Sequence, residues 1–153
     1  MDFRIEQITT AKKRFLDLLL LGDEQESMID RYLEQGEMFA LYDTSQHPIA
    51  TAVITQVDKV TIELKNLAVA PSHQHRGHGR RMIEFICEHY KSKYHTLLVE
   101  TDDSPSTTTF YSRCGFTRSH VKRDFFTLNY DHPIYEEGVL LRDMIYFRRM
   151  LHP

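Results

Sequence analysis

"NLAVAPSHQHRGHGRRMIEFI" (residues 66–86) is the stretch of this chain that most clearly indicates its fold. Its first part is an apolar run that ends at Val69, its middle holds Gly77 and Gly79, and its last part places apolar residues at helical spacing. This order predicts a strand, a loop and a helix that begins near Gly77. A further apolar strand is predicted over residues 95–101, and such a strand–helix–strand unit implies a right-handed crossover between parallel strands.

The rest of the chain supplies an antiparallel half before this unit and two further strands after it. Alternating apolar patterns and turn residues predict strands over residues 2–8, 38–42, 49–57, 60–69, 115–126 and 142–150. Helical spacing predicts helices over residues 10–21, 24–35, 79–93 and 105–115, with Thr9 or Thr10 as the first N-cap and Gly36 as the second C-cap. We therefore expect an α/β (α+β) fold with a mixed central sheet of about six to seven strands, flanked on both faces by about four helices.

Length and composition restrict the classes of function. The 153 residues suggest a single domain over residues 1–153, and an apolar share of 41% with a charged share of 27% is typical of globular chains. The net charge of −3 argues against a general nucleic-acid coat, and the longest apolar run, residues 18–21, is too short to span a membrane. Cys87 and Cys114 form no CxxC pair, which argues against a structural zinc site and a secreted disulfide scaffold. The expected location is a reducing cytoplasm.

The loop after Val69 has the features of an anion site. A strand that leads through a loop into a helix aims free main-chain N–H groups and the positive end of the helix dipole at one point. Gly77 and Gly79 lack Cβ atoms, so a phosphate can approach the main chain, and three nearby arginines add positive charge. A GxxxxGK[ST] loop is absent, and a dinucleotide fingerprint needs a small residue where Met82 stands. Residues 74–79 fit the pattern [QR]xxGx[GA] instead.

Residues 66–86 resemble the central motif of the GNAT superfamily of acyl-CoA-dependent N-acetyltransferases. A second stretch, "TTFYSRCGF" (residues 108–116), resembles the FYxxxGF signature of the same family, and one helix and one strand separate the two, as in the family. The expected order of strands and helices also resembles the family's over almost the whole chain. The tail "RDFFTLNYDHPIYEEGVLLRDMI" (residues 123–145) is similar to that of a bacterial subgroup of largely uncharacterised members.

The resemblance implies a binding site for acetyl-CoA as cosubstrate, with no metal. It implies that the main chain of the loop wraps the CoA pyrophosphate, through Gln74, His75, Arg76, Gly77, His78, Gly79 and Arg80. It also implies that the edge of the preceding strand, at Leu67, Ala68 and Val69, pairs with the pantetheine arm. Where the family often has an asparagine that contacts the cofactor, this chain has Ser104. A serine keeps one hydrogen-bond donor but has a shorter reach.

The resemblance further implies an N-acetyltransferase in which an amine attacks the thioester directly within a ternary complex. Tyr111 matches the family's general acid, which contacts the cofactor and protonates the departing thiolate, and a phenol with an ordinary pKa near about 10 carries that proton at neutral pH. Glu63 matches the base position of histone-type members. Strand alternation places residues 63, 65, 67 and 69 on one face, where Glu63 can take the amine's proton. Glu100 is the second candidate base, and a relay of water molecules without any protein base is the alternative.

Other interpretations of the histidine-rich loop are weaker. The spacing of His73, His75 and His78 matches no standard metal site, so we expect three surface side chains and no metal. The basic stretch is short and carries no interleaved aromatic residues, which argues against nucleic acid as a partner. A non-catalytic sensor that binds acyl-CoA remains an alternative function.

The acceptor is less defined by the sequence. Three acidic segments, residues 22–27, 102–103 and 130–138, would attract a cationic amine if they converged. They contain Asp23, Glu24, Glu26, Asp102, Asp103, Asp131, Glu136 and Glu137. We therefore expect a small cationic amine as acceptor, with a protein N-terminus or lysine as the alternative. We place Phe125, Phe126, Tyr146 and Phe147 in the last strands, in the core or at the interface of a homodimer.

Overall fold

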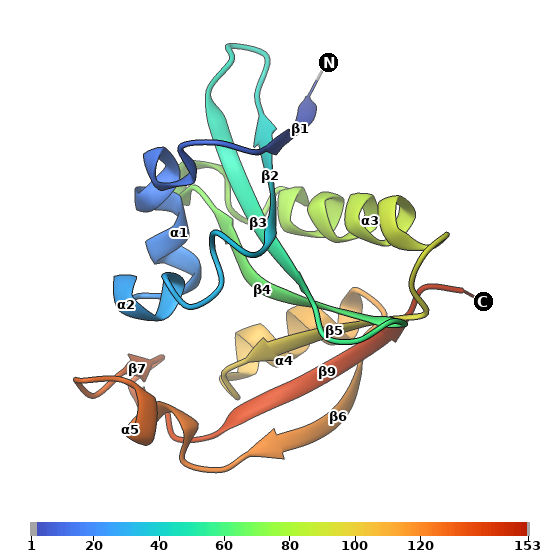
Figure 1. Ribbon diagram of the computed structural model, residues 1–153. Helices are drawn as coiled ribbons and strands as arrows, with labels where there is room; N and C mark the ends of the chain where they lie inside the picture. The colour runs from blue at the N-terminus through green and yellow to red at the C-terminus, as the bar shows by residue number, and fades with distance from the viewer. Residues whose placement is uncertain (1–2, 153) are drawn as a thin grey trace.

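A sheet of seven strands organises the structure (Figure 1). The computed structural model describes residues 3–152, and in it the strands lie in the order β1-β2-β3-β4-β5-β9-β6. The strands are β1 (Arg4–Ile8), β2 (Glu37–Tyr42), β3 (Pro48–Gln56), β4 (Thr61–Val69), β5 (Thr96–Thr101), β6 (Thr117–Lys122) and β9 (Met144–Met150). The helices are α1 (Leu16–Gly22), α2 (Glu26–Ile29), α3 (His78–Tyr90), α4 (Pro105–Arg113) and α5 (Phe125–Asn129), with 3-10 turns at η1 (Lys12–Phe15) and η2 (Pro71–His73).

The expected mixed sheet is confirmed, and the boundary between its two central strands, β4 and β5, is its most unusual part. Every neighbouring pair is antiparallel except β4 and β5, which run parallel and are joined through α3. Pairing between these two strands extends only as far as Leu64 opposite Val99, whereas β4 continues beside β3 as far as Val69. The two central strands therefore diverge, and residues 65–69 of β4 keep an edge that no described strand covers.

Helices cover both faces of the sheet, as expected, because the inner strands alternate their side chains between two cores. In β2, Met38 and Ala40 pack with residues of η1, α1 and α2, while Phe39 and Leu41 pack against α3. Figure 1 accordingly shows α1 and α2 on the opposite side of the sheet from α3. Within residues 3–152, no helix is long and apolar enough to cross a membrane.

A β-bulge at Lys65 overturns the expected alternation in β4. Opposite consecutive residues of β3, Val53 and Ile54, the partners in β4 are Asn66 and Leu64, so Lys65 is an extra residue. Ile62 and Leu64 therefore share the α3 face with Leu67 and Val69, and Glu63 does not. The prediction that residues 63, 65, 67 and 69 share one face is wrong, because one extra residue reverses the alternation.

The second predicted helix is also much shorter than residues 24–35. Helix α2 ends at Ile29, and a series of turns continues to Gly36. The buried ammonium group of Lys12 explains this change, because it donates hydrogen bonds to the carbonyl oxygens of Leu33 at 2.9 Å and of Gly36 at 2.7 Å. The first predicted helix begins with η1 rather than at a threonine cap, and Ala11, with φ 49°, occupies the N-cap position.

Residues 123–143, which we call the lid segment, also differ from the predicted structure. The strand predicted over residues 115–126 ends at Lys122, and the chain turns at Asp124, whose φ is 55° and whose N–H donates to Asp143 at 2.9 Å. Helix α5 follows, and then a small hairpin of β7 (Tyr135–Glu136) and β8 (Val139–Leu140). Phe126, Ile134 and Leu141 of the lid segment form a separate small core with Met144 and Tyr146 of β9. Phe125 and Phe126 therefore lie in a helix and not in a strand.

Candidate active site

The loop after β4 presents its main chain to solvent. The side chain of Gln74 donates a hydrogen bond to the carbonyl oxygen of Val69 at 3.0 Å and so closes the loop against the strand. Gly77 adopts φ 85° and precedes α3, and no side chain caps the first turn of that helix. A Cβ atom at Gly77 would meet nothing within 4 Å, whereas one at Gly79 would lie 3.1 Å from the ring of Phe110. Uncapped amides beside open space form a geometry suited to an anion.

The predicted cofactor residues are distributed around this loop. Gln74, His75, Arg76, Gly77 and Arg80 are exposed, and Gly79 is half-exposed. His75 adopts φ 62°, an uncommon conformation for a side-chain-bearing residue. On the strand, Leu67 lines the cleft described below, Val69 is half-buried and Ala68 is buried.

The three histidines of the loop do not share one environment. His73 is half-buried and His75 is exposed, but only 5% of His78 is exposed. The ring centroid of His78 lies 4.9 Å from that of Phe3 and 6.0 Å from that of His73. Burial, together with the charge of Arg81, lowers the pKa of the His78 imidazole. The prediction of three surface histidines is therefore wrong for His78, which begins α3 and packs against Phe3, next to β1.

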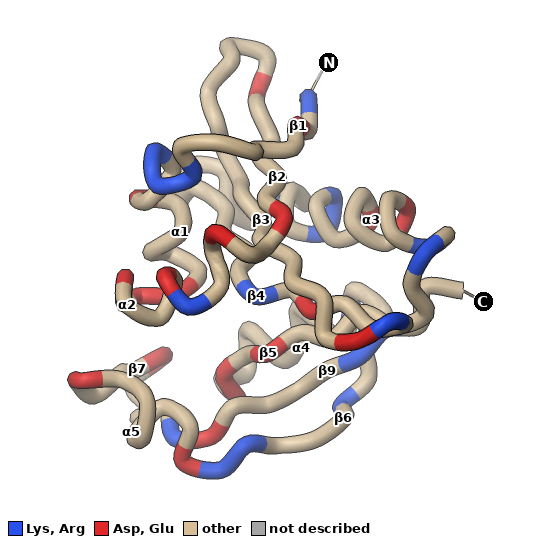
Figure 2. The backbone as a smooth tube through the Cα atoms, in the orientation of Figure 1, with Lys and Arg blue, Asp and Glu red and all other residues tan. Residues whose placement is uncertain are grey.

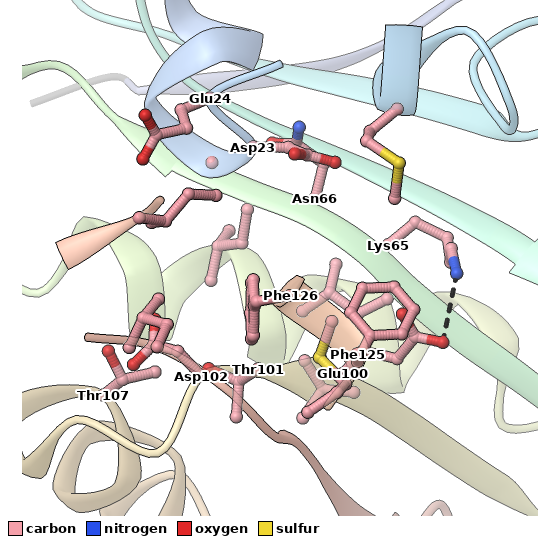
Figure 3. Close-up of a pocket in the computed structure, with 18 of the residues that line it drawn as sticks. Asp23, Glu24, Lys65, Asn66, Glu100, Thr101, Asp102, Thr107, Phe125 and Phe126 are labelled. Carbon is pink, nitrogen blue, oxygen red and sulfur yellow. Dashed lines mark ion pairs between the residues drawn. The ribbon is translucent and has the colours of Figure 1, made fainter. Parts of the chain in front are cut away.

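A cleft of about 630 Å³ opens where β4 and β5 diverge. Its walls come from the turn between α1 and α2, the diverging ends of β4 and β5, helix α4 and the lid segment. Figure 3 shows Asp23 and Asn66 on one wall, and Thr101 and Asp102 on the other. The cleft thus lies beside the uncovered edge of β4, and Gln74 connects it to the loop.

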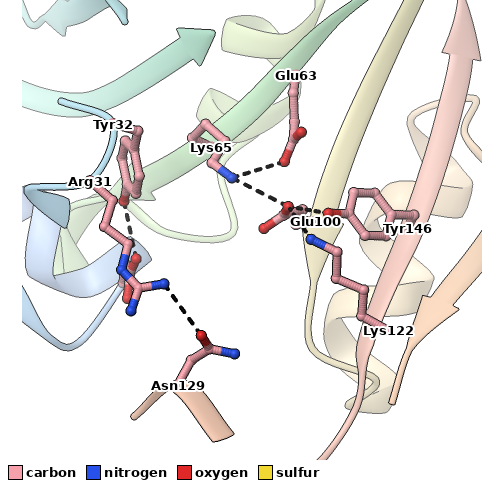
Figure 4. Close-up of polar contacts among 9 residues, drawn as sticks. Arg31, Tyr32, Glu63, Lys65, Glu100, Lys122, Asn129 and Tyr146 are labelled. Atoms are coloured by element: carbon pink, nitrogen blue, oxygen red, sulfur yellow. Dashed lines mark hydrogen bonds and ion pairs between the residues drawn. The ribbon is translucent and has the colours of Figure 1, made fainter. Parts of the chain in front are cut away.

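The lid segment is tied to the opposite wall by polar contacts. The Tyr130 hydroxyl donates to Asp23 at 2.7 Å. Arg31 donates to the side-chain oxygen of Asn129 at 3.3 Å (Figure 4). Two further contacts join His132 to Glu24 and the N–H of Asp131 to Gln25. Phe125 and Phe126 both line the cleft, and Phe126 is also part of the small core, as expected, with Phe125 packed against it.

The two candidate bases, Glu63 and Glu100, form one charged group with Lys65. Its ammonium nitrogen lies 3.1 Å from a carboxylate oxygen of Glu63 and 3.3 Å from one of Glu100 (Figure 4). Tyr146 also donates to Glu100, and Lys122 lies 3.8 Å from it. Glu100 lines the cleft, whereas Glu63 does not. The bulge is the cause of this arrangement, because it places a cation between the two carboxylates.

The two carboxylates differ in acidity. The pKa of Glu63 is raised to about 7, first by burial and then by the hydrogen bond and negative charge of Glu100, against the opposing effect of Lys65. Burial also acts on Glu100, but its contacts with Glu63, Lys65 and the Tyr146 hydroxyl outweigh burial and lower its pKa. The carboxylate with access to the cleft is therefore the more acidic of the pair.

Tyr111, the predicted general acid, is a buried residue of α4. Its ring packs against Phe110, Phe116 and Phe147, with centroids between 5.0 and 6.2 Å away, and the residue lines the cleft. Burial raises the pKa of its hydroxyl, and the neighbouring Cys114 and Asp102 add to the effect. The phenol therefore keeps its proton at neutral pH.

Ser104, which we expect to contact the cofactor, occupies the N-cap position of α4. It is buried, and its hydroxyl donates to Thr107 at 2.9 Å. Thr107 lines the cleft while Ser104 does not. The sequence pattern identified the start of α4 but did not identify Thr107 as a residue that lines the cleft.

Only part of the predicted acidic set reaches the cleft. Asp23, Glu24, Asp102 and Glu136 line it. Figure 2 shows acidic positions along the chain near α2, β5 and β7. Glu26 pairs with Lys13, and Asp131 pairs with His132, while Asp103 and Glu137 lie elsewhere. Arg31, Lys65 and Lys122 are the basic residues that line the cleft. Among the described residues, no group of three or more His, Cys, Asp or Glu side chains is arranged to hold a metal ion.

Three residues of the site were not identified from the sequence. Asn66 is buried and donates hydrogen bonds from its side chain to the carbonyl oxygen of Leu19 at 2.9 Å and to the hydroxyl of Tyr32 at 3.0 Å. The Tyr32 hydroxyl in turn contacts Asp23 at 3.2 Å. Lys65 is the third. Each looks like an ordinary strand or helix residue in sequence, and only the long-range contacts reveal its role.

Known proteins resemble this chain in sequence. Residues 34–118 match the family model of the GNAT acetyltransferase domain. Over 144 residues the chain is 31% identical to the uncharacterized N-acetyltransferase YvbK of Bacillus subtilis (strain 168), with 93% of this chain and 92% of the relative covered.

Solved structures resemble it over nearly the whole chain. A GNAT family acetyltransferase from Elizabethkingia anophelis with acetyl-CoA bound aligns with a TM-score of 0.91 and 31% identity, covering 97% of both chains. An IAA acetyltransferase from Bacillus cereus ATCC 14579 aligns with a TM-score of 0.90 and 30% identity, covering 97% of this chain and 99% of that one. An acetyltransferase from Bacillus subtilis in complex with CoA gives 0.88 and 30%, with the same coverage.

Proposed function

The chain belongs to the GNAT family of N-acetyltransferases, and we propose that it transfers the acetyl group of acetyl-CoA to the primary amine of a small cationic acceptor. The observation that carries the acceptor class is the covered cleft, in which the lid segment is bound to the turn between α1 and α2. An acceptor peptide needs an open groove for its backbone, whereas a small amine fits a covered pocket. Acetylation of a protein N-terminus or lysine is therefore the second candidate.

For acetyl-CoA, the residues present fit the cosubstrate. The solved relatives from Elizabethkingia anophelis and Bacillus subtilis bind acetyl-CoA and CoA, respectively. In this chain, we assign the pyrophosphate to the uncapped amides of the loop at residues 74–80, beside the open space at Gly77. The pantetheine arm has hydrogen-bonding groups similar to those of a peptide, and we assign it to the uncovered edge of β4 at residues 67–69.

In the proposed reaction, the neutral amine nitrogen attacks the carbonyl carbon of the thioester. A carbon–nitrogen bond forms, the carbon–sulfur bond breaks with its electron pair going to the sulfur, and the nitrogen loses one proton to solvent as it becomes the amide. Tyr111 donates its proton to that sulfur, which its raised pKa permits because the phenol is protonated beforehand. Solvent then returns a proton to the tyrosinate. Tyr111 is therefore the catalytic acid of the proposal.

We assign the role of base to the Glu63–Glu100 pair rather than to either residue alone. Glu100 has access to the cleft, but a lowered pKa makes it a weak base. Glu63, with a pKa of about 7, is better matched to neutral pH but lies behind Lys65. The proton of the ammonium ion passes to this pair, and the amine becomes able to attack.

The charge of the cleft supports a cationic acceptor. Five acidic and three basic side chains line it, and two of the three basic residues, Lys65 and Lys122, contact Glu100. The uncompensated charge is therefore negative, which raises the local concentration of cations.

The buried free thiols of Cys87 and Cys114 support a reducing compartment, and we propose the cytoplasm as the location. Strands from Arg4 to Met150 share one sheet, which supports a single domain.

The test is the rate of CoA release over a panel of small amines and peptides at equal concentration. We expect small diamines and other cationic amines to give the highest kcat/KM values. A peptide that exceeded every small amine would favour the second candidate instead. Tight binding of acetyl-CoA without turnover on any amine would favour an acyl-CoA sensor.

A parallel experiment addresses the base. Below pH 7 the rate should fall as the Glu63–Glu100 pair takes up a proton, and Glu63→Gln should lower kcat and remove this acidic limb. An unchanged pH profile in Glu63→Gln would exclude the pair and favour a relay of water molecules.

A further inference from the structure

The geometry points to Asp23 as the residue that selects an acceptor with a second cationic group, such as a diamine. This inference rests on the proposed function and adds the class of acceptor to it. Asp23 lines the cleft on the wall opposite Thr101 and Asp102 (Figure 3). The second cation would be bound there while the first amine reacts.

Asp23 is held in place from three directions. The carboxylate accepts hydrogen bonds from Tyr130 at 2.7 Å and from Tyr32 at 3.2 Å, one on each oxygen. Its own N–H donates to the carbonyl oxygen of Leu19 at 3.0 Å, which ends α1. Asn66 then fixes Tyr32 through a bond of 3.0 Å. The carboxylate therefore has a defined orientation before any acceptor enters.

Gly22 is needed for this placement. A Cβ atom at Gly22 would lie 2.1 Å from the side-chain oxygen of Asn66 and 3.1 Å from the carbonyl oxygen of Leu67. The end of α1 can therefore approach β4 only without a side chain, and the next residue along the chain is Asp23. Close packing of the helix on the strand thus brings the carboxylate to the cleft.

The hydrogen-bond partners of Asp23 carry no positive charge, and Lys65 acts on the carboxylate only from beyond the distance of an ion pair. Both side-chain donors are neutral phenols, and among residues 3–152 no Lys or Arg nitrogen lies within the 4.0 Å of an ion pair with it. Glu100, by contrast, contacts Lys65 and Lys122. A half-buried carboxylate that lacks a cation, in the cleft of an amine-acetylating enzyme, is suited to a cation of the acceptor.

That cation is a second group rather than the reacting nitrogen. A carboxylate in contact with an ammonium ion stabilises its protonated form, and a protonated nitrogen cannot attack the thioester. An amine bound directly to Asp23 would therefore be held unreactive. An acceptor with two cationic groups avoids this conflict, because Asp23 orients one group while the other loses its proton at the Glu63–Glu100 pair.

The experiment compares 1,4-diaminobutane with 1-aminopentane, which has a methyl group in place of the second ammonium ion. We expect the wild type to prefer the diamine in kcat/KM. Asp23→Asn should lower kcat/KM for the diamine by on the order of tenfold to a hundredfold, the range of a charge-assisted hydrogen bond, and change that for 1-aminopentane less than about threefold. Glu26→Gln is the matched control, since it removes one negative charge three positions away on a side chain that contacts Lys13 outside the cleft.

The remaining outcomes separate this inference from the proposed function. Equal losses on both amines in Asp23→Asn, with an unchanged KM for acetyl-CoA, would show that Asp23 only supports the lid segment and would overturn the inference. So would a wild type that prefers 1-aminopentane. If the wild type acetylates neither amine, the proposed function fails. Calorimetry then measures the binding of 1,4-diaminobutane in the presence of CoA. Binding that Asp23→Asn weakens at least tenfold supports the role of Asp23, and the absence of binding overturns it. Tyr130→Phe keeps the carboxylate and removes one donor, so it should retain a preference for the diamine even if its melting temperature falls.

Discussion

The loop after β4 and the cleft lie side by side but are built in different ways. The loop at residues 70–80 is one continuous piece of chain, and its proposed contacts come from main-chain amides around Gly77. The cleft is built from side chains of five separate regions, and its central contact joins Tyr130 to Asp23, 107 positions apart. Main-chain recognition depends on few residue types, so a loop of this kind can stay the same while the cleft changes its acceptor.

The largest effect should come from Tyr111, which serves both regions. Tyr111→Phe removes the proton donor but keeps the ring among Phe110, Phe116 and Phe147. We expect kcat to fall about 10² to 10³-fold with every acceptor, while KM for acetyl-CoA changes little, because general acid catalysis contributes on that scale. Steady-state kinetics with two unlike amines measures this. An unchanged kcat would remove Tyr111 from the mechanism.

Two glycines, one in each region, offer a matched comparison. Gly77 and Gly138 both have a positive φ, 85° and 78°, and a Cβ atom at either would meet nothing within 4 Å. Gly77→Ala should raise KM for acetyl-CoA about three- to tenfold, because the strained residue moves the loop amides away from the pyrophosphate. Gly138→Ala strains the hairpin of the lid segment and should change KM for the amine instead. If both variants altered the same KM, the division between the two regions would be wrong.

The pH dependence of acceptor choice gives a smaller effect. Burial raises the pKa of Asp23, and the hydrogen bonds from Tyr130 and Tyr32 oppose the shift without cancelling it. As the pH falls through this raised pKa, Asp23 becomes neutral, so preference for the diamine should decline at a higher pH than for an ordinary aspartate. The ratio of kcat/KM for 1,4-diaminobutane and 1-aminopentane between pH 8 and pH 4 is the measurement. Asp23→Asn should give a low and constant ratio.

The last effect concerns stability and not catalysis. The pKa of Glu63 rises from its ordinary 4.5 to about 7 in the folded protein, so the folded state binds a proton more readily than the unfolded state. This contribution to stability is present below about pH 4.5 and is lost as the pH rises through 7. Glu63→Gln mimics the neutral form, and should stabilise the protein at pH 8 by at most about 3 kcal/mol and leave it nearly unchanged at pH 4. Melting temperatures at the two pH values test this. A variant that is less stable at pH 8 would show that the contact with Lys65 dominates.

The same division explains what the sequence could predict. The loop was predictable because a glycine, a preceding strand and a following helix are local features, and the seven-stranded sheet follows from local patterns too. The bulge at Lys65 was not, because residues 61–69 contain nothing that distinguishes an extra residue from regular alternation. The short α2 depends on the ammonium group of Lys12, which binds carbonyl oxygens more than 20 positions away. The contents of the cleft depend on the lid segment, whose fold is determined by its own small core.

The divergence of β4 and β5 also has a consequence for the amide protons of the sheet. Between Lys65 and Val69, the N–H groups of β4 that point away from β3 have no partner strand within residues 3–152, although they lie in the middle of a seven-stranded sheet. Without acetyl-CoA, these protons should exchange with deuterium as quickly as those of an edge strand, while their neighbours that bond to β3 exchange slowly. The cosubstrate would then act as a temporary strand, and its arrival and departure could be followed one amide at a time.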